Sequence, residues 1–240
     1  MSGVPMTSKD GRSTVLEIED VEAFAGSLKG RLLPPGSPDY DQARRVWNGM
    51  VDRRPGLIVE CGGAPDVVRS VRFAADHDLL VSVKGGGHSI AGSGVCQGGL
   101  MISLGRMRSV QVDPEARRAR VGPGTLLAEL DREAQVFGLA TPLGINSTTG
   151  VAGLTLGGGF GWLSRKHGLT IDNLISADVV TAAGDFLVAS RTENPDLFWG
   201  IRGGGGNLGV VTSFEFRLHP VGPEVLAGLL VHSLASAGPV

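Results

Sequence analysis

Glycine is gathered in four short clusters, and this clustering restricts the chain more than any other feature of its sequence. The clusters lie at 85–87, 92–99, 157–161 and 203–209, and the chain carries 38 glycines in 240 residues, against an average of about 7%. A collagen helix needs glycine at every third position, so the clusters exclude it. Disorder is disfavoured, because 42% of the residues are hydrophobic and only 19% are charged, which is enough apolar surface for a core.

Charge and cysteine content point away from several classes of partner. The net charge is −2 and only 5% of residues are aromatic, which gives neither the field nor the stacking platform of a nucleic-acid-binding protein. Cys61 and Cys96 stand alone and the five histidines lack ligand spacing, so no disulfide framework or metal site is expected. The uncharged stretch 134–164 is interrupted by Pro142 and Asn146, which disfavours a membrane span. We expect a cytoplasmic protein without nucleic-acid or membrane partners, whose oligomeric state the sequence does not indicate.

Short apolar segments alternate with turn residues and predict mixed secondary structure. Helices are expected over 21–28, 65–77, 125–137 and 194–202. Strands are expected over 57–60, 79–83, 100–104, 109–113, 118–121, 175–181, 186–190 and 210–218. Thr125 is expected to cap its helix, Gly138 to end it, and Trp199 to lie in the core. One β-α-β stretch among several hairpins is typical of the α+β class rather than of a doubly wound sheet.

The segment 83–90, which reads VKGGGHSI, carries the most informative pattern. Successive glycines at a strand end can turn backbone N–H groups into a concavity that binds an anion such as a pyrophosphate. The missing Cβ atoms also let the backbone approach a flat ligand closely. His88 in such a loop could attack an electrophilic carbon of a bound cofactor. A flexible loop at a sheet corner with an exposed histidine accounts for the same residues, so both interpretations stay open at this point.

Residues 204–209, which read GGGNLG, fit the dinucleotide-binding pattern GxGxxG literally. A dinucleotide-binding turn follows a strand and opens a helix. This segment instead follows an expected helix and leads into an expected strand, so we reject the dinucleotide interpretation. The sequences GK, GxSxG and HExxH are absent from the chain, which argues against a P-loop, a nucleophile elbow and a zinc protease.

Four motifs occur in an order that resembles a known family. They are GGGHS at 85–89, GVAGLTLGGGFG at 150–161, DNL at 172–174 and WGIRGGGGNLGVV at 199–211. Together they resemble the FAD-binding domain of the berberine-bridge-enzyme-like FAD-linked oxidases, in the vanillyl-alcohol oxidase or PCMH-type flavoprotein superfamily. The resemblance covers about residues 31–230, and four collinear motifs are far more specific than any one of them.

The resemblance implies a PCMH-type FAD-binding domain made of two α+β subdomains, with FAD between them and the GGGHS loop around the pyrophosphate. It also implies that His88 carries the flavin through its 8α-methyl carbon, a bond that prevents cofactor loss and favours hydride acceptance. Some members of the family add a second link from a cysteine shortly before the GVxG sequence, where this chain has Asn146. A single covalent link, through His88, is therefore expected.

The same resemblance implies FAD contacts spread over three segments of the chain. Thr149 would lie near the flavin ring, although packing explains it equally well, and Val210 and Val211 would meet the adenine half. The expected cofactor-binding residues are His88, Lys84, Gly85, Gly86, Gly87, Ser89, Ile90, Ser147, Thr148, Thr149, Gly150, Gly153, Leu154, Gly158, Gly159, Gly161, Gly209, Val210 and Val211.

The family's chains are close to twice this length, which shapes the expected domain organisation. The ranges expected are an N-terminal helical lead-in at 1–44, the FAD-binding domain at 45–220 with subdomains at about 45–105 and 106–220, and the start of a truncated substrate domain at 221–240, with its first strand over 226–231. No catalytic base is assigned here, because the family's base usually comes from the part beyond this chain.

The implied function is that of an FAD-dependent oxidase. A hydride passes from a small-molecule substrate to covalently bound FAD, and dioxygen reoxidises the flavin and yields hydrogen peroxide. The alternative is a truncated FAD-binding module without turnover of its own. The identity of the substrate is left open, because specificity in this family resides in the substrate domain.

Overall fold

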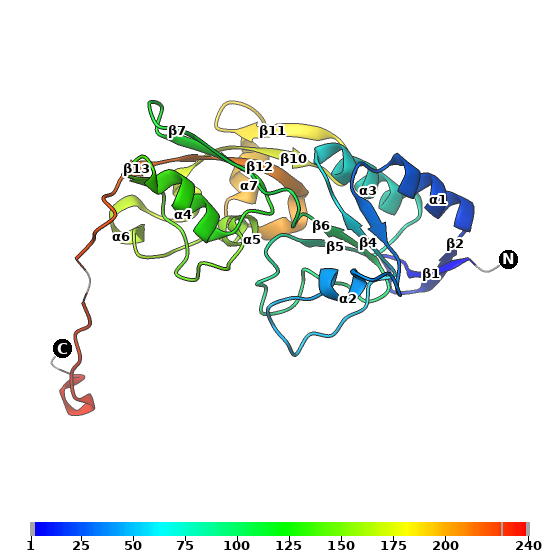
Figure 1. Cartoon of the computed structure of the whole chain (residues 1–240), viewed down its shortest axis with the longest axis horizontal. Helices are drawn as coiled ribbons and strands as arrows, with labels where there is room; N and C mark the ends of the chain where they lie inside the picture. The colour runs from blue at the N-terminus through cyan, green and yellow to red at the C-terminus, as the bar shows by residue number, and fades with distance from the viewer. Residues whose placement is uncertain (1–2, 227, 239–240) are drawn as a thin grey trace.

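The computed structural model describes residues 3–226 and 228–238, which form two large sheets and two small two-stranded ones, with helices packed between and around them (Figure 1). The N-terminal half contains a four-stranded sheet in the order β3-β4-β6-β5. Its strands are β3 (Arg31–Leu33), β4 (Leu57–Glu60), β5 (Val81–Lys84) and β6 (Leu100–Ser103). Strands β4, β6 and β5 are parallel, and residues 57–59 and 100–102 are fully buried. Burial on both faces explains the uninterrupted apolar runs of β4 and β6.

The second sheet has five antiparallel strands in the order β11-β10-β12-β8-β7. Its strands are β7 (Val110–Asp113), β8 (Arg118–Val121), β10 (Leu174–Val180), β11 (Phe186–Ser190) and β12 (Val210–Arg217). In β12, Phe214 and Phe216 are fully buried while Ser213 and Glu215 face outward. This alternation is that of an antiparallel sheet with one face on the core. The combination of the two sheets confirms the α+β class.

Helices connect the two sheets and complete their cores. The long helix α3 (Ala64–Asp76) contacts β6 in the first sheet and both β10 and β12 in the second. Helices α4 (Leu127–Gln135), α5 (Val151–Leu156) and α7 (Pro195–Ile201) share one buried cluster with the five-stranded sheet. The two sheets are therefore joined through α3, and α5 is fixed against the second sheet.

Smaller elements fill the remaining length. They are β1 (Val4–Thr7), β2 (Ser13–Leu16), α1 (Ile18–Ser27), α2 (Tyr40–Ala43), β9 (Leu139–Ala140), α6 (Ser164–His167), β13 (His219–Pro220) and 3₁₀ turns at Thr170–Asn173, Gly205–Leu208 and Leu234–Ser236. Strands β1 and β2 form a hairpin, and β13 pairs with β9. After β13, the described residues run away from the body of the molecule (Figure 1).

The helix expected over 125–137 is present but begins two residues later than predicted, as α4. Thr125 is buried and is not its cap, because its hydroxyl is paired with the backbone of Ser109. Instead, the side chain of Glu129 accepts a hydrogen bond from the backbone N–H of Leu126 at 2.7 Å. A backbone donor at the start of the helix is thus paired with a side chain from the first turn of the same helix. The helix ends at Gln135, two residues before the expected end, and Gly138 follows in a turn with a φ of +64° that favours glycine.

Two further expectations about buried or paired residues are corrected by the structure. Trp199 is 80% exposed, because Phe198 and Ile201 occupy the inward positions of α7 and leave the intervening residue outside. The strand expected over 226–231 is absent from Leu226 and residues 228–231, which are exposed and unpaired with any described strand. Ala227 lies outside the described residues.

Two histidines stack where β13 meets the body of the protein. The rings of His167 and His219 are 3.9 Å apart between centroids and 15° from parallel. The Nε2 atom of His219 lies 2.6 Å from the Oδ1 atom of Asn173 and donates to it. Burial lowers the pKa of His219 from its ordinary value of 6.5, and the positive charges of His167, Arg217 and Lys166 lower it further.

This depressed pKa predicts that the chain loses stability as the pH falls below 6.5. Between pH 6.5 and the lower pKa of the folded state, the His219 side chain binds a proton in the unfolded chain but not in the folded chain. The free energy of unfolding therefore decreases as the pH falls through this range. Urea unfolding at about pH 7.5 and about pH 5.5 measures the loss. His219→Gln keeps a donor for Asn173 and should reduce the pH dependence, whereas the exposed control His232→Gln should not. Equal slopes for all three chains would contradict the assignment.

Candidate functional site

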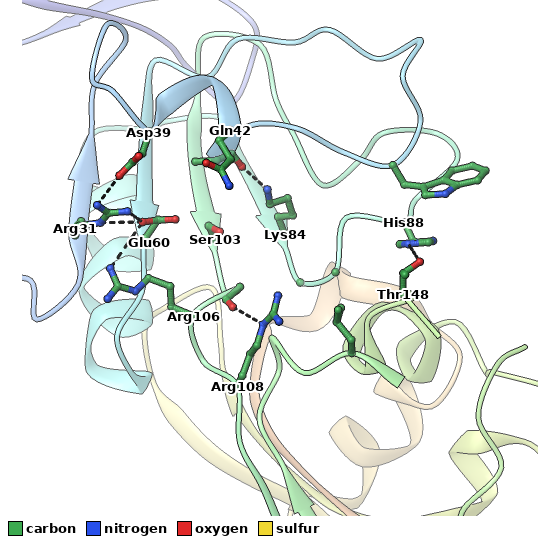
Figure 2. Close-up of a pocket in the computed structure, with 16 residues that line it drawn as sticks. Arg31, Asp39, Gln42, Glu60, Lys84, His88, Ser103, Arg106, Arg108 and Thr148 are labelled. Atoms are coloured by element: carbon green, nitrogen blue, oxygen red, sulfur yellow. Dashed lines mark hydrogen bonds and ion pairs between the residues drawn. The ribbon is translucent and has the colours of Figure 1, made fainter. Parts of the chain in front are cut away.

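A cavity of about 600 Å³ lies at the carboxyl ends of the parallel strands, in the position where open α/β sheets bind ligands (Figure 2). Glu60, Lys84 and Ser103, the last residues of β4, β5 and β6, form one wall. Leu126 and Thr148 from the second half of the chain form the opposite wall. The cavity therefore lies between the two sheet-bearing halves of the protein.

The glycine loop that follows β5 forms the floor between these walls. Gly85 and Gly86 line the cavity, and a Cβ atom on Gly86 would lie 2.5 Å from the backbone of Gly150. Gly87 has a φ of +73°, which favours glycine. Within the described chain, the N–H groups of Gly85, Gly86 and Gly87 donate no hydrogen bond. Consecutive free N–H groups at a concave surface are the donor set that binds a pyrophosphate.

Lys84 fastens a neighbouring segment over this loop. Its Nζ atom donates to the carbonyl oxygens of Ala43 and Arg45, the latter at 3.1 Å, and burial lowers the pKa of its ammonium group. The backbone N–H of Trp47 donates to the carbonyl of Gly87 at 2.9 Å, which adds a second tie. Lys84, which was expected to contact the cofactor, lines the cavity and also uses its ammonium group to hold the loop in place.

His88 is held between two side chains at the edge of the cavity (Figure 2). The ring of Trp47 lies 5.5 Å away and 23° from parallel, and the hydroxyl of Thr148 is 3.1 Å from the Nε2 atom. His88 is half-buried, so its ring is positioned and still accessible. This is the arrangement expected of a nucleophile directed at a bound molecule.

A second group of glycines faces open space beside α5. A Cβ atom on Gly153, Gly158, Gly205 or Gly206 would meet no protein atom within 4 Å. Gly158 and Gly205 have positive φ angles that favour glycine for conformational reasons, but Gly153 lies in helix α5 with no such need. The 3₁₀ turn at Gly205–Leu208 contacts α5. Gly158 is itself buried, whereas Gly153 and Gly206 are exposed and Gly205 is partly exposed, so these three leave a surface without side chains, which suits the close approach of a flat ligand.

Other glycines of the expected set are explained by the fold itself. A Cβ atom on Gly161 would overlap the carbonyl oxygen of Leu143, and one on Gly159 would overlap Thr170. Gly209 has a φ of +138°, and its Cβ atom would lie 2.5 Å from the carbonyl oxygen of Val180. The structure thus separates glycines that the chain needs for packing from those that leave room for a ligand.

The remaining expected contacts differ in their surroundings. Leu154 packs against the buried cluster of the second sheet, and Val210 and Val211 are buried in two different clusters. Ile90 is exposed, and its carbonyl accepts a hydrogen bond from Asn48 at 2.7 Å. The hydroxyl of Ser89 lies 2.8 Å from that of Ser93.

The loop 147–150 is anchored to the start of α4. The carbonyl of Ser147 accepts from Ala128 at 3.1 Å, and the carbonyl of Thr149 accepts from Leu127 at 2.9 Å. The backbone of Thr149 is therefore fixed against the start of α4.

A set of charged residues at the far end of the cavity was not among the site residues expected from the sequence. Arg31 bonds to Asp39 at 2.7 Å and to Glu60, and Arg106 lies 3.9 Å from the same Glu60 carboxylate. Arg108 pairs with Glu129 at 3.1 Å beside them. These residues come from segments far apart in the sequence, so no local pattern could have grouped them.

The cysteines and the metal-ligating residue types offer no second site. Burial raises the pKa of the Cys61 thiol to about 12 and also raises that of Cys96, which leaves both thiols unreactive. Within residues 3–226 and 228–238, His, Cys, Asp and Glu side chains do not gather in a group of three or more that could hold a metal ion. The helices in the same part of the chain are all too short or too polar to cross a bilayer.

Comparison with protein-family models identifies the domain. The model described as "FAD binding domain" matches residues 55–190, which include the glycine loop, His88 and Thr148. The chain belongs to this FAD-binding domain family. The family assignment confirms the resemblance drawn from the four motifs, including the PCMH-type fold and FAD as the cofactor of the family.

The relatives of this FAD-binding domain are named as oxidoreductases. This chain is 41% identical to (R)-6-hydroxynicotine oxidase of Paenarthrobacter nicotinovorans, over 85% of its own length and 44% of that protein. It is 40% identical to the FAD-linked oxidoreductase pgmH of Aspergillus terreus, over 88% of this chain and 43% of that protein. The chain therefore spans somewhat less than half the length of the curated relatives it matches.

Solved structures give the same picture. The crystal structure of 6-hydroxy-D-nicotine oxidase from Arthrobacter nicotinovorans superposes with a TM-score of 0.79 at 41% identity, covering 81% of this chain and 43% of that one. Glucooligosaccharide oxidase from Acremonium strictum, described as carrying 6-S-cysteinyl, 8α-N1-histidyl FAD, gives a TM-score of 0.77 at 35% identity, covering 83% of this chain and 42% of that one.

Proposed function

We propose that this chain is the FAD-binding part of an oxidase that takes a hydride from a small organic substrate. FAD is linked covalently to His88, and dioxygen reoxidises it and yields hydrogen peroxide. The observation that carries the proposal is the placement of His88. Its ring is held by Trp47 and Thr148 at the end of a loop whose three glycine N–H groups are free. The named oxidase relatives support the reaction class.

The residues present fit FAD by their chemistry. The free N–H groups of Gly85, Gly86 and Gly87 would bind the pyrophosphate through backbone dipoles, which suits a chain of low net charge. The bare face of α5 at Gly153 would admit the flat part of the cofactor. When bound, FAD supplies a hydride acceptor. The protein residues position it, shield it and fix it to the chain.

Alanine at Gly153 should separate cofactor binding from folding. An added Cβ meets no protein atom and removes a glycine from a helix, so Gly153→Ala should raise the free energy of unfolding of the FAD-free chain by about 0.5–1 kcal/mol. The same methyl group would enter the space assigned to FAD and lower the affinity about tenfold or more. Urea unfolding and fluorescence titration with FAD measure the two effects.

Gly26→Ala is the matched control for this substitution. Gly26 lies in helix α1, and its Cβ atom also meets nothing within 4 Å. It should stabilise the chain similarly without changing the affinity for FAD. If Gly153→Ala and Gly26→Ala bind FAD equally well, the α5 face is not part of the cofactor site.

A second candidate function is an FAD-binding module without turnover of its own. It is favoured by the observation that this chain covers less than half the length of its relatives. The relatives are named for nicotine and oligosaccharide substrates. The purified chain is therefore tested for hydrogen peroxide release with amines, alcohols and oligosaccharides. Release that requires His88 supports the oxidase, whereas covalent FAD without release from any of these substrates supports the module.

A further inference from the structure

Asn146, Thr148 and His88 form a short hydrogen-bonded relay at the cavity wall. The backbone N–H of Thr148 donates to the Oδ1 atom of Asn146 at 3.1 Å. The hydroxyl of Thr148 lies 2.8 Å from the same oxygen, and 3.1 Å from the Nε2 atom of His88. In Figure 2 the hydroxyl of Thr148 points directly at the imidazole.

The direction of each hydrogen bond in this relay is determined by the backbone. An N–H group can only donate, so the Asn146 atom facing it must be the carbonyl oxygen and not the amide nitrogen. Between that oxygen and the Thr148 hydroxyl, the only available hydrogen belongs to the hydroxyl, which therefore donates to Asn146. Thr148 is left with lone pairs toward His88, so the Nε2 atom must carry the hydrogen.

The loop that holds the relay is fixed at several points, although Asn146 and Thr148 are exposed. The backbone N–H of Thr149 donates to the carbonyl of Asn146 at 3.0 Å. Both Ser147 and Thr149 are also bonded to the start of α4 through their carbonyls. The two polar side chains are therefore presented to His88 by an anchored backbone, which reduces the entropy lost in forming the relay.

We propose that Asn146 and Thr148 are positioning residues that hold the neutral imidazole of His88 with its hydrogen on Nε2 and leave Nδ1 as the nucleophilic nitrogen. Within the described chain, Nδ1 has no hydrogen-bond partner. One hydrogen bond of ordinary strength favours a tautomer by about 2- to 12-fold. The relay thus selects which nitrogen is linked to the flavin, an extension that rests on the proposed covalent attachment.

The linkage itself balances with dioxygen as the oxidant. A C–N bond forms between Nδ1 and the 8α carbon, one C–H bond of that methyl group breaks, and its electron pair stays on the flavin ring. The hydrogen released from carbon and the hydrogen on Nε2 leave as protons. Dioxygen then accepts two electrons and two protons and becomes hydrogen peroxide. Thr148 accepts a hydrogen bond from Nε2–H and therefore stabilises the positive charge that develops on the ring.

The tautomer can be measured without any flavin. In the FAD-free chain labelled with ¹⁵N-histidine at about pH 8, above the ordinary histidine range, the nitrogen shifts of His88 report which nitrogen carries hydrogen. The wild type is expected to be mainly the Nε2–H form. Asn146→Ala frees the Thr148 hydroxyl to donate to Nε2 as well as to accept from it, so the preference is lost and the tautomer ratio should shift toward Nδ1–H by about 2- to 12-fold. A wild-type ratio near one, or an unchanged ratio in Asn146→Ala, would overturn the proposal.

Rates of covalent FAD incorporation provide the second readout. Thr148→Val removes the preference for the Nε2–H tautomer and should slow covalent FAD incorporation by about 3- to 10-fold. Thr148→Ser keeps the hydroxyl and should incorporate FAD at the wild-type rate. Asn146→Ala should slow incorporation by a similar factor, and the double variant should be no slower than Thr148→Val, because without the hydroxyl Asn146 has no influence. Additive effects would contradict the relay. The exposed Thr192→Val serves as the control for an unrelated threonine.

The linked nitrogen distinguishes this proposal from the proposed function. Proton NMR of the isolated flavin peptide is expected to show attachment at Nδ1, and attachment at Nε2 would overturn the relay. If the wild-type chain shows the Nε2–H form but takes up no covalent flavin, the covalent link is wrong and the tautomer assignment stands.

Discussion

His88→Ala is expected to release all FAD from the acid-precipitated chain, whereas the wild-type pellet stays yellow. Among the described residues, His88 is the imidazole at the cavity edge, while Lys84 is engaged with two backbone carbonyls and both thiols are buried. The expected change in covalent flavin is from nearly complete to none, the largest effect on the cofactor. Absorbance of pellet and supernatant after precipitation measures it directly.

The folded chain should tolerate this substitution. His88 is half-buried and loses one hydrogen bond and one ring contact, so the free energy of unfolding should fall by only about 1 kcal/mol. His232→Ala, in the exposed C-terminal segment, is the control and should retain covalent FAD. A yellow pellet from His88→Ala would show that another residue carries the flavin and would contradict the assignment.

Asp66→Ala should have the largest effect on folding. The Asp66 carboxylate is fully buried and accepts three backbone hydrogen bonds, from Lys29 at 2.9 Å and from Gly30 and Gly62 at 2.8 Å each. It ties the segment before β3 and the turn after β4 to the first turn of α3. Alanine removes the acceptor of all three backbone donors at once, together with a buried charge that they stabilise, which should cost about 3–5 kcal/mol of unfolding free energy.

Urea unfolding of the Asp66→Ala chain checks this expectation. Asp76→Ala is the control, because Asp76 is exposed at the other end of the same helix and removal of its charge from the helix C-terminus should be nearly neutral. A loss below about 1 kcal/mol for Asp66→Ala would mean that water or other groups replace the carboxylate.

Segments with strong periodic patterns could be predicted from the sequence. The strands at 57–60, 118–121 and 186–190 were expected at the residues where they lie, because apolar or alternating residues between turn signals define a strand locally. The four collinear motifs also identified the family and its cofactor. Local pattern and motif order thus determine the fold class and the general position of the site.

Features made by contacts between distant segments could not be predicted. Helix α5 contains Gly153 and follows Gly150, so its local propensity is poor, and burial of Val151 and Thr155 against the second sheet stabilises it instead. The ties from Lys84 and Trp47 to distant backbone groups have no sequence signature.

The presence of a glycine in the sequence does not show whether the fold requires it for packing or whether it leaves room for a ligand. Gly161 is glycine because a Cβ would overlap the Leu143 carbonyl, whereas Gly153 faces open space. In the sequence, both belong to one motif and both were expected to contact FAD. Only the three-dimensional surroundings show that the first is required by the fold and the second leaves room for a ligand.

The intact mass of the purified wild-type chain, measured under denaturing conditions after incubation with FAD and air, tests the central claim most directly. Covalent attachment at His88 predicts a mass equal to the polypeptide plus one FAD less two hydrogens, and the mass of the polypeptide alone for His88→Ala. A wild-type mass equal to the bare polypeptide, with all FAD removed by denaturation, would contradict the account.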